Sequence, residues 1–277
     1  FWLKIAARGA LRLGAKPGLP PHPRPSRWRP PGWAAMADAG YLAFHGQSVS
    51  IKDAERDVRM GFVRKVYGIL AVQLLLTVAI ASFICRLPRQ VMLSNIWMVN
   101  ASSCALLGVL LVMMCVPSVL RTYPGNYLFL FGLTFAEAVM VGFVSATYST
   151  GVVMLAFWMT AFLFAGLSAY AWTTKSDFTG LGPYLSGLLI ALCAMGLGVW
   201  LMQAFGVHMP LMTKLYGACG VLLFTMFIVF DTQKILGVLG GHKQEFSVDD
   251  YCAAALSLYL DIINIFVDLL SLLGDNR

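Results

Sequence analysis

The sequence predicts an all-α membrane protein, a bundle of seven transmembrane helices, and three observations lead to this prediction. Of the 277 residues, 59% are hydrophobic and only 12% are charged, whereas about 25% of the residues of a soluble domain are charged. The mean hydropathy is +0.75. Seven apolar stretches approach or reach the length of about 20 residues that a helix needs to span a bilayer. These stretches are Val66–Cys85, Ile96–Leu120, Tyr127–Ala146, Val152–Trp172, Tyr184–Phe205, Leu215–Leu239 and Tyr251–Leu273.

A basic, proline-rich segment precedes the first apolar stretch. Residues 1–35 contain no acid and include the run KPGLPPHPRPSRWRPPGW, which neither holds a helix nor buries a core. We therefore expect a disordered segment over residues 1–62 and a seven-helix transmembrane domain over residues 63–274. An Arg-rich, acid-free composition is also typical of an organellar transit peptide. Alternatively, Met36 is an ordinary start and residues 1–35 are an upstream extension.

The connections between the apolar stretches are short. RLPRQ follows the first stretch and RTYPGN follows the second, so consecutive helices are expected to pack antiparallel in a compact bundle without a soluble domain. Small residues at helical spacing, such as Gly217 with Gly220 and Gly187 with Ala191, would let neighbouring helices approach closely.

The positive charge of the chain is concentrated before the first span. The net charge is +7, and 12 of the 20 Lys and Arg residues precede residue 66. This distribution indicates membrane orientation rather than nucleic-acid binding, and it places the N-terminal segment in the cytosol. With seven spans the C-terminus lies on the opposite side; if the last stretch re-enters without crossing, it returns to the cytosol. Five of these charges crowd the membrane entry: Lys52, Arg56, Arg59, Arg64 and Lys65.

Cysteine and histidine patterns do not predict a cofactor. The six cysteines form no CxxC motif and have no regular spacing, and the four histidines fall outside the centres of the apolar stretches. A disulfide framework, a zinc site and a haem site are therefore not expected.

Four acids lie inside the predicted spans, where a lipid-facing carboxylate would cost about 2.5 to 3.5 kcal/mol. They are Glu137, Asp231, Asp261 and Asp268. Asp261 shares one helix face with Asn264 and Asp268, one and two turns further on, and antiparallel packing could bring Asp231 level with Asp261. Burial favours the neutral acid, and two close carboxyls tend to share one proton. The pair therefore suggests a proton switch; alternatively, the acids only form hydrogen bonds between helices.

Arg121, at the end of the second apolar stretch, is the nearest candidate cation for this pair. It either latches an ionised aspartate or extends to the membrane interface. Glu137, Asn264 and Asp268 are secondary candidates for an ion pathway. Two aspartates and an asparagine supply fewer than the six to eight oxygens that Ca²⁺ takes. We therefore expect Asp231 and Asp261 to bind Ca²⁺ weakly and transiently, which suits conduction.

Four segments resemble a known family. FVRKVYGILAVQLLLT in the first span, VFDTQKI in the sixth and LSLYLDIINIFVDLL in the seventh are similar to the transmembrane Bax-inhibitor-motif family, in its Lifeguard or Golgi anti-apoptotic branch. TYPGNYLFLFGLTFAEA, which contains Glu137, is similar to that branch too. The resemblance covers approximately residues 57–274. The segment GVLGGHKQEFSVDD between the two aspartates is longer than is usual in the family.

The resemblance implies a seven-helix fold with the last helix central, in the endoplasmic reticulum or Golgi. It implies a pH-sensitive calcium leak channel that protects against cell death, with the bilayer, Ca²⁺ and H⁺ as partners. Cell-death regulators or other calcium channels are further candidate partners. The family's paired-aspartate sensor corresponds to Asp231 and Asp261, and its latch to Arg121.

Two other functions are compatible with paired intramembrane acids. A non-conducting scaffold could regulate cell-death or calcium-channel partners by binding them. An intramembrane aspartyl protease would use one carboxyl to activate water and the other to donate a proton. Such enzymes carry YD, GxGD and PAL motifs, whereas this chain has FD, YLD and no PAL. We therefore do not expect an enzyme.

Overall fold

The computed structural model describes residues 51–95, 97, 98, 101, 102, 123–207, 209–237 and 246–274. Every regular element within these ranges is a helix, and no strand occurs among them. Six of the helices are long and apolar enough to cross a membrane. The prediction of an all-α membrane protein is therefore confirmed. The second predicted span, residues 96–120, lies almost entirely outside the described residues, so the count of seven stays a prediction.

Each long helix overlaps one of the predicted stretches. The long helices are α3 (Ile51–Cys85), α6 (Gly125–Ala146), α7 (Thr150–Thr173), α8 (Gly182–Ala204), α9 (Pro210–Leu236) and α10 (Tyr251–Leu273). The shorter elements are α4 (Arg89–Ser94) and the 3₁₀ turns η2 (Thr179–Leu181) and η4 (Val248–Asp250).

Helix α3 begins earlier than the sequence predicts. The expected disordered segment extends to residue 62, but residues 51–62 are helical. Arg59 and Phe62 are each only 3% exposed, and the Arg59 guanidinium lies 4.7 Å from the centre of the Phe62 ring. Arg59 and Phe62 are therefore anchored in the bundle by a helix where composition alone predicts a tail. Residues 1–50 lie outside the described residues, so disorder there stays a prediction.

Local signals define several helix ends. The Ser149 hydroxyl accepts a hydrogen bond from the Val152 N–H at 3.4 Å and caps the start of α7, as a serine N-cap does. Pro210 is the first residue of α9, where its missing N–H has no helical partner to lose. Gly237 follows α9 with φ of +51°, a backbone conformation that glycine adopts without steric cost.

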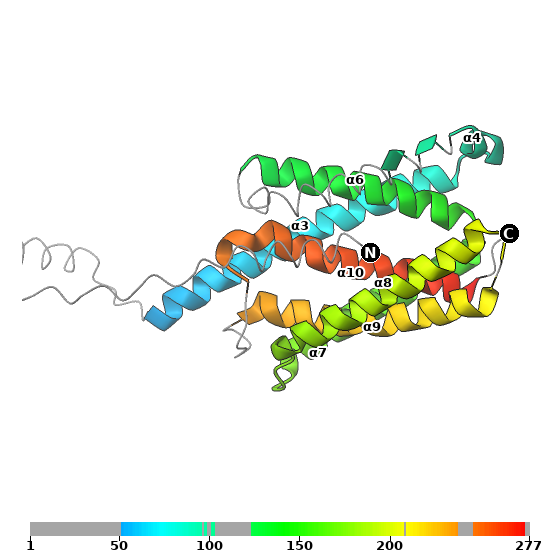
Figure 1. The fold of residues 1–277 in the computed structure, drawn as a ribbon. Coiled ribbons are helices and arrows are strands. Elements are labelled where there is room, and N and C mark those ends of the chain that lie inside the picture. The colour runs from blue at the N-terminus through cyan, green and yellow to red at the C-terminus, as the bar shows by residue number, and fades with distance from the viewer. Residues whose placement is uncertain are drawn as a thin grey trace, which may run out of the picture.

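Helix α10 lies among the other spans. It contacts α3, α6, α7 and α9, and Figure 1 shows it running between the α3–α6 pair and the group formed by α7, α8 and α9. In the most apolar part of α10, 72% of the residues are buried, compared with 17% in α7 and 22% in the span that contains α8. The residues of α10 therefore contact protein on nearly all sides, and those of α7 and α8 largely face outward.

The outward faces of the peripheral helices are apolar. Phe162 of α7 is 76% exposed and Ile190 of α8 is 60% exposed. Apolar surface exposed on this scale marks contact with lipid or another protein. A helix suits a lipid environment, because its backbone N–H and C=O groups are paired within the helix. The fold is that of a multi-pass membrane protein in contact with the bilayer.

Candidate functional site

Three close approaches fix how α9 packs against α10. The Ser257 hydroxyl donates a hydrogen bond of 2.5 Å to Asp231 Oδ2. A Cβ atom added at Gly220 would overlap the Asp268 carboxyl, and one added at Gly217 would overlap the Ser271 hydroxyl. The residue pairs are thus Gly217 with Ser271, Gly220 with Asp268, and Asp231 with Ser257. As the residue number rises along α9, it falls by the same amount along α10. The two helices are therefore antiparallel in a single register, and we call their line of contact the α9–α10 seam.

Both predicted sensor residues lie on this seam. Asp231 is 1% exposed and Asp261 is fully buried. In the register above, Asp231 lies opposite Ser257 and Asp261 lies opposite Phe227. The two aspartates are thus offset along the seam by four residues, one helical turn or about 6 Å. Ser257 shares a helix face with Asp261 and lies one turn before it, at the level of Asp231.

Helix α10 carries a row of polar side chains along the seam. Their spacing alternates between four and three residues, which keeps them on one side of a helix facing a partner. Asn264 is half-buried, and its amide donates to the Leu260 carbonyl of its own helix at 2.6 Å. The row consists of Ser257, Asp261, Asn264, Asp268 and Ser271.

The glycines of α9 permit this close packing. The prediction that Gly217 and Gly220 let helices approach is confirmed, because each has α10 side-chain atoms where a Cβ would lie. The pair that includes Gly187 does not act in this way, since no atom lies within 4 Å of a Cβ added there.

Arg59 of α3 holds the end of α9 that carries Asp231. Its guanidinium donates to the carbonyl oxygens of Lys234 at 2.6 Å and Ile235 at 3.0 Å. It also donates to those of Leu236 at 3.3 Å and Phe246 at 2.6 Å. The last carbonyls of a helix have no partner within the helix, and a cation is favourable at that end of the helix dipole. Arg59 therefore joins α3 to α9 and to the segment that leads into α10.

Gln233 holds the same end of α9 from another side. Its side-chain oxygen accepts from the Phe178 N–H, and its amide nitrogen donates to the Ser176 carbonyl, both at 2.8 Å. Gln233 is fully buried, so these bonds fasten the α7–α8 connection onto α9. Asp231 thus lies on a helix end that is fixed by two buried polar side chains.

A second polar cluster lies on the other side of α10. The Gln73 amide donates to the Thr134 hydroxyl at 2.9 Å, and the hydroxyls of Thr77 and Tyr259 are 2.9 Å apart. Glu137 of α6 is half-buried, and its carboxyl lies within electrostatic range of the Tyr259 hydroxyl. Tyr259 lies two residues after Ser257 and two residues before Asp261. Because two residues turn a helix by about 200°, the Tyr259 side chain points to the side of α10 opposite the seam. Glu137 is therefore not brought together with the two aspartates.

Replacing Tyr259 with phenylalanine is expected to lower the free energy of unfolding by about 1 kcal/mol, because the buried Thr77 hydroxyl keeps its bond to the Gln73 carbonyl but loses the one to Tyr259. Thermal unfolding of the purified protein in detergent measures the change. Tyr184→Phe is the matched control, since Tyr184 is 73% exposed. An equal effect of the two substitutions would contradict the assigned hydrogen bond.

The remaining predicted residues do not complete a metal site in the described part of the chain. Arg121 lies outside the described residues, so its role as a latch stays a prediction. Within the described ranges, no three His, Cys, Asp or Glu side chains converge as metal ligands. Asp231, Asp261 and Ser257 offer five oxygens at most, fewer than Ca²⁺ takes without water. The arrangement suits proton exchange and weak cation contact.

Ser257, Arg59 and Gln233 were not singled out as site residues from the sequence. Ser257 had a detectable signal, because it lies four residues before Asp261 and so shares its helix face. Arg59 had none, because it belongs to the basic group at the membrane entry and resembles its neighbours there.

The fold and the α9–α10 seam together define a class: a multi-pass helical membrane protein with buried acids between its last two helices. Residues 59–277 match the family described as "Inhibitor of apoptosis-promoting Bax1". The chain belongs to this family, the Bax inhibitor-1/Lifeguard family.

Relatives in animals and plants support this assignment. Human "Protein lifeguard 3" is 31% identical over 95% of this chain and 89% of its own length. "Protein LIFEGUARD 4" of Arabidopsis thaliana is 34% identical over 78% of this chain and 85% of its own length. Mouse "Protein lifeguard 4" is 33% identical over 80% and 88% respectively. The similarity thus extends over most of the transmembrane domain.

Proposed function

We propose that this chain is a pH-sensitive cation leak channel that passes Ca²⁺ across an endomembrane and protects the cell against death signals. One observation carries the proposal: Asp231 and Asp261, from adjacent helices, are both buried on the α9–α10 seam one turn apart. Family membership supports the protective role, since the matching family is described by inhibition of apoptosis. The family resemblance also favours the endoplasmic reticulum or Golgi as the compartment.

The proposed switch is the protonation state of the two aspartates. Two carboxylates that are offset by one helical turn, about 6 Å along the seam, in a medium of low dielectric constant repel each other if both are ionised. A proton shared by the pair removes that repulsion and favours close packing of α9 on α10. A ligand or proton must favour one arrangement by about 5.5 kcal/mol to move a population from 1:99 to 99:1. Loss of one buried charge supplies energies of this order.

The other predicted residues have subsidiary roles in this scheme. We infer that Arg121 pairs with the ionised form of an aspartate and so competes with the proton. The row of oxygens on α10 that includes Asn264 and Asp268 would offer a permeating cation successive weak contacts. The burial of α10 supports the family's arrangement of a last helix wrapped by the other six.

The test is Ca²⁺ flux into proteoliposomes across a pH series. We expect the wild type to conduct with a pH-dependent rate. The double variant Asp231→Asn, Asp261→Asn should conduct at a rate that no longer follows pH between the wild-type extremes. Asp249→Asn is the control, because Asp249 is exposed and precedes α10; its pH profile should match the wild type.

Three outcomes would contradict the proposal. An unchanged pH profile in the double variant would exclude the aspartate switch. Absence of flux from the wild type would favour a scaffold that acts by binding partners. Cleavage of a transmembrane peptide, lost on Asp→Asn substitution, would favour a protease.

A further inference from the structure

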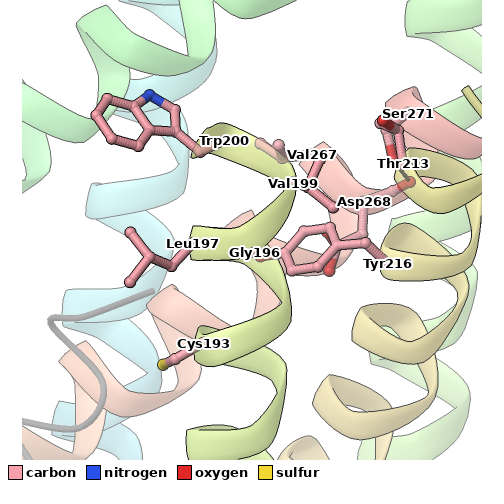
Figure 2. A pocket seen from close by; sticks show the side chains of 10 residues that line it. All are labelled: Cys193, Gly196, Leu197, Val199, Trp200, Thr213, Tyr216, Val267, Asp268 and Ser271. Carbon is pink, nitrogen blue, oxygen red and sulfur yellow. Dashed lines mark hydrogen bonds between the residues drawn. The ribbon is translucent and has the colours of Figure 1, made fainter. Parts of the chain in front are cut away.

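Asp268 lies at a cavity that the proposed proton switch does not use. The cavity has a volume of about 400 Å³ and lies between α8, α9 and α10. Asp268 is only 6% exposed, and its Oδ2 atom has no hydrogen-bond partner among the described residues. A buried acceptor without a partner is costly, and the residue that carries it lines the cavity. Figure 2 shows Asp268 beside Tyr216 at this cavity.

Polar and apolar groups are unequally distributed around the cavity. The polar ones are the Asp268 carboxyl and the hydroxyls of Thr213, Tyr216 and Ser271. The Ser271 hydroxyl donates to the Asp268 carbonyl at 2.8 Å, so its oxygen lone pairs remain able to accept. The other lining residues are apolar or small. One carboxyl, a few hydroxyls and a mainly apolar wall are typical of a small-molecule site.

The outer wall of the cavity faces the lipid. Leu197 and Trp200 of α8 are 48% and 63% exposed, and Figure 2 shows both projecting from α8 away from Tyr216 and Asp268. The cavity therefore has apolar side chains on its lipid side and the Asp268 carboxyl on its protein side. This geometry suits a molecule that partitions into the membrane with a hydrocarbon part and presents one polar group.

We propose that this cavity binds the ammonium group of a long-chain primary amine, with Asp268 as its counter-ion and the hydrocarbon chain along α8. An ammonium has three N–H donors and no acceptor, which matches the Asp268 carboxylate and the nearby hydroxyl oxygens. The face of an aromatic ring such as Tyr216 also attracts a cation. Ca²⁺ fits less well, because one carboxyl and three hydroxyls fall short of six oxygens. The inference goes beyond ion conduction and does not require it.

The test is equilibrium binding of radiolabelled dodecylamine to the purified full chain in phosphatidylcholine nanodiscs, with empty nanodiscs subtracted. Dodecanol of the same chain length is the neutral comparison. We expect the wild type to bind the amine at least about tenfold more tightly than the alcohol, because only the amine forms a charge-assisted hydrogen bond. Asp268→Asn should remove this preference, whereas Asp249→Asn should retain it.

A steric variant tests the position of the site without changing its charge. A Cβ atom at Gly196 would lie 2.9 Å from the Tyr216 ring. Gly196→Ala should therefore displace Tyr216 and weaken binding of the amine and the alcohol alike.

The outcomes distinguish the natural source of the amine. Displacement of dodecylamine by phosphatidylethanolamine in the nanodisc would support the site and identify a lipid headgroup as its occupant. Retention of dodecylamine would support a free lipophilic amine. Equal binding of amine and alcohol by the wild type, which requires no variant to fold, would overturn the proposal. Ca²⁺ is expected to make only weak contact with Asp268, so displacement of the amine by an equal concentration of Ca²⁺ at constant ionic strength would also overturn the proposal.

Discussion

Replacing Arg59 with alanine is expected to lower the free energy of unfolding by about 3 kcal/mol or more. The guanidinium satisfies four carbonyl oxygens at the end of α9 and just beyond it. Leaving a buried acceptor without a donor costs about 1 to 3 kcal/mol, and water replaces only part of this at a position that is 3% exposed. Chemical unfolding in mixed detergent micelles measures the change.

Arg64→Ala is the matched control for this prediction. Arg64 lies on the same helix, is exposed, and carries the same charge. Its substitution should change the unfolding free energy by about 0.5 kcal/mol or less. If both substitutions had equal, small effects, Arg59 would be only a charge at the membrane entry and not a link between α3 and α9.

Replacing Gly220 with alanine is expected to destabilise the protein by about 3 kcal/mol, although alanine normally favours a helix over glycine. A Cβ at this position would overlap the Asp268 carboxyl, and forcing extra atoms into a well-packed interface typically costs about 1 to 3 kcal/mol. The shift in thermal unfolding temperature measures the effect. Gly132→Ala is the control, because no atom lies within 4 Å of a Cβ added there.

A second substitution tests whether the clash is with Asp268. In the Gly220→Ala, Asp268→Ala double variant the overlapping carboxyl is removed, so part of the lost stability should return. The interaction between the two substitutions should therefore be favourable in a double-mutant cycle. Strictly additive losses would contradict the register assigned to the α9–α10 seam.

Hydropathy predicted most of the fold, because a bilayer imposes a length and an apolar composition on every spanning segment. The six described spans overlap the predicted stretches. A carboxylate facing lipid is costly, so Asp231 and Asp261 were expected to face protein, and both are buried. The start of α3 could not be predicted in this way. Arg59, in the third turn of α3, bonds to the distant end of α9, and a local polar composition carries no sign of such contacts.

The register of the α9–α10 seam also lay beyond the sequence. Residues 237–250 connect the two helices, and a connection of that length permits several registers that differ by a turn. Close packing at Gly217 and Gly220 selects one of them. The sequence suggested that the two aspartates lie level, whereas in this register Asp231 is level with Ser257 and Asp261 lies one turn away.

The polar cluster that includes Gln73 and Glu137 illustrates the same limit. The two residues lie on different helices, Gln73 on α3 and Glu137 on α6. Tyr259, which is fully buried, connects them through its hydroxyl at the opposite side of α10. Tyrosine in an apolar segment gives no indication of which face its hydroxyl occupies, so the joint cluster could only be found in three dimensions.

The proposed switch requires that Asp231 and Asp261 act as one titrating unit. The most direct measurement compares the pH profile of Ca²⁺ flux in the two single Asn variants and in the double variant. Because the apparent pKa values of coupled carboxyls belong to the pair, each single variant is predicted to shift the midpoint of the profile, and only the double variant to remove the pH response. Single variants that each keep the wild-type midpoint of the remaining response would show two independent groups and contradict the proposed switch.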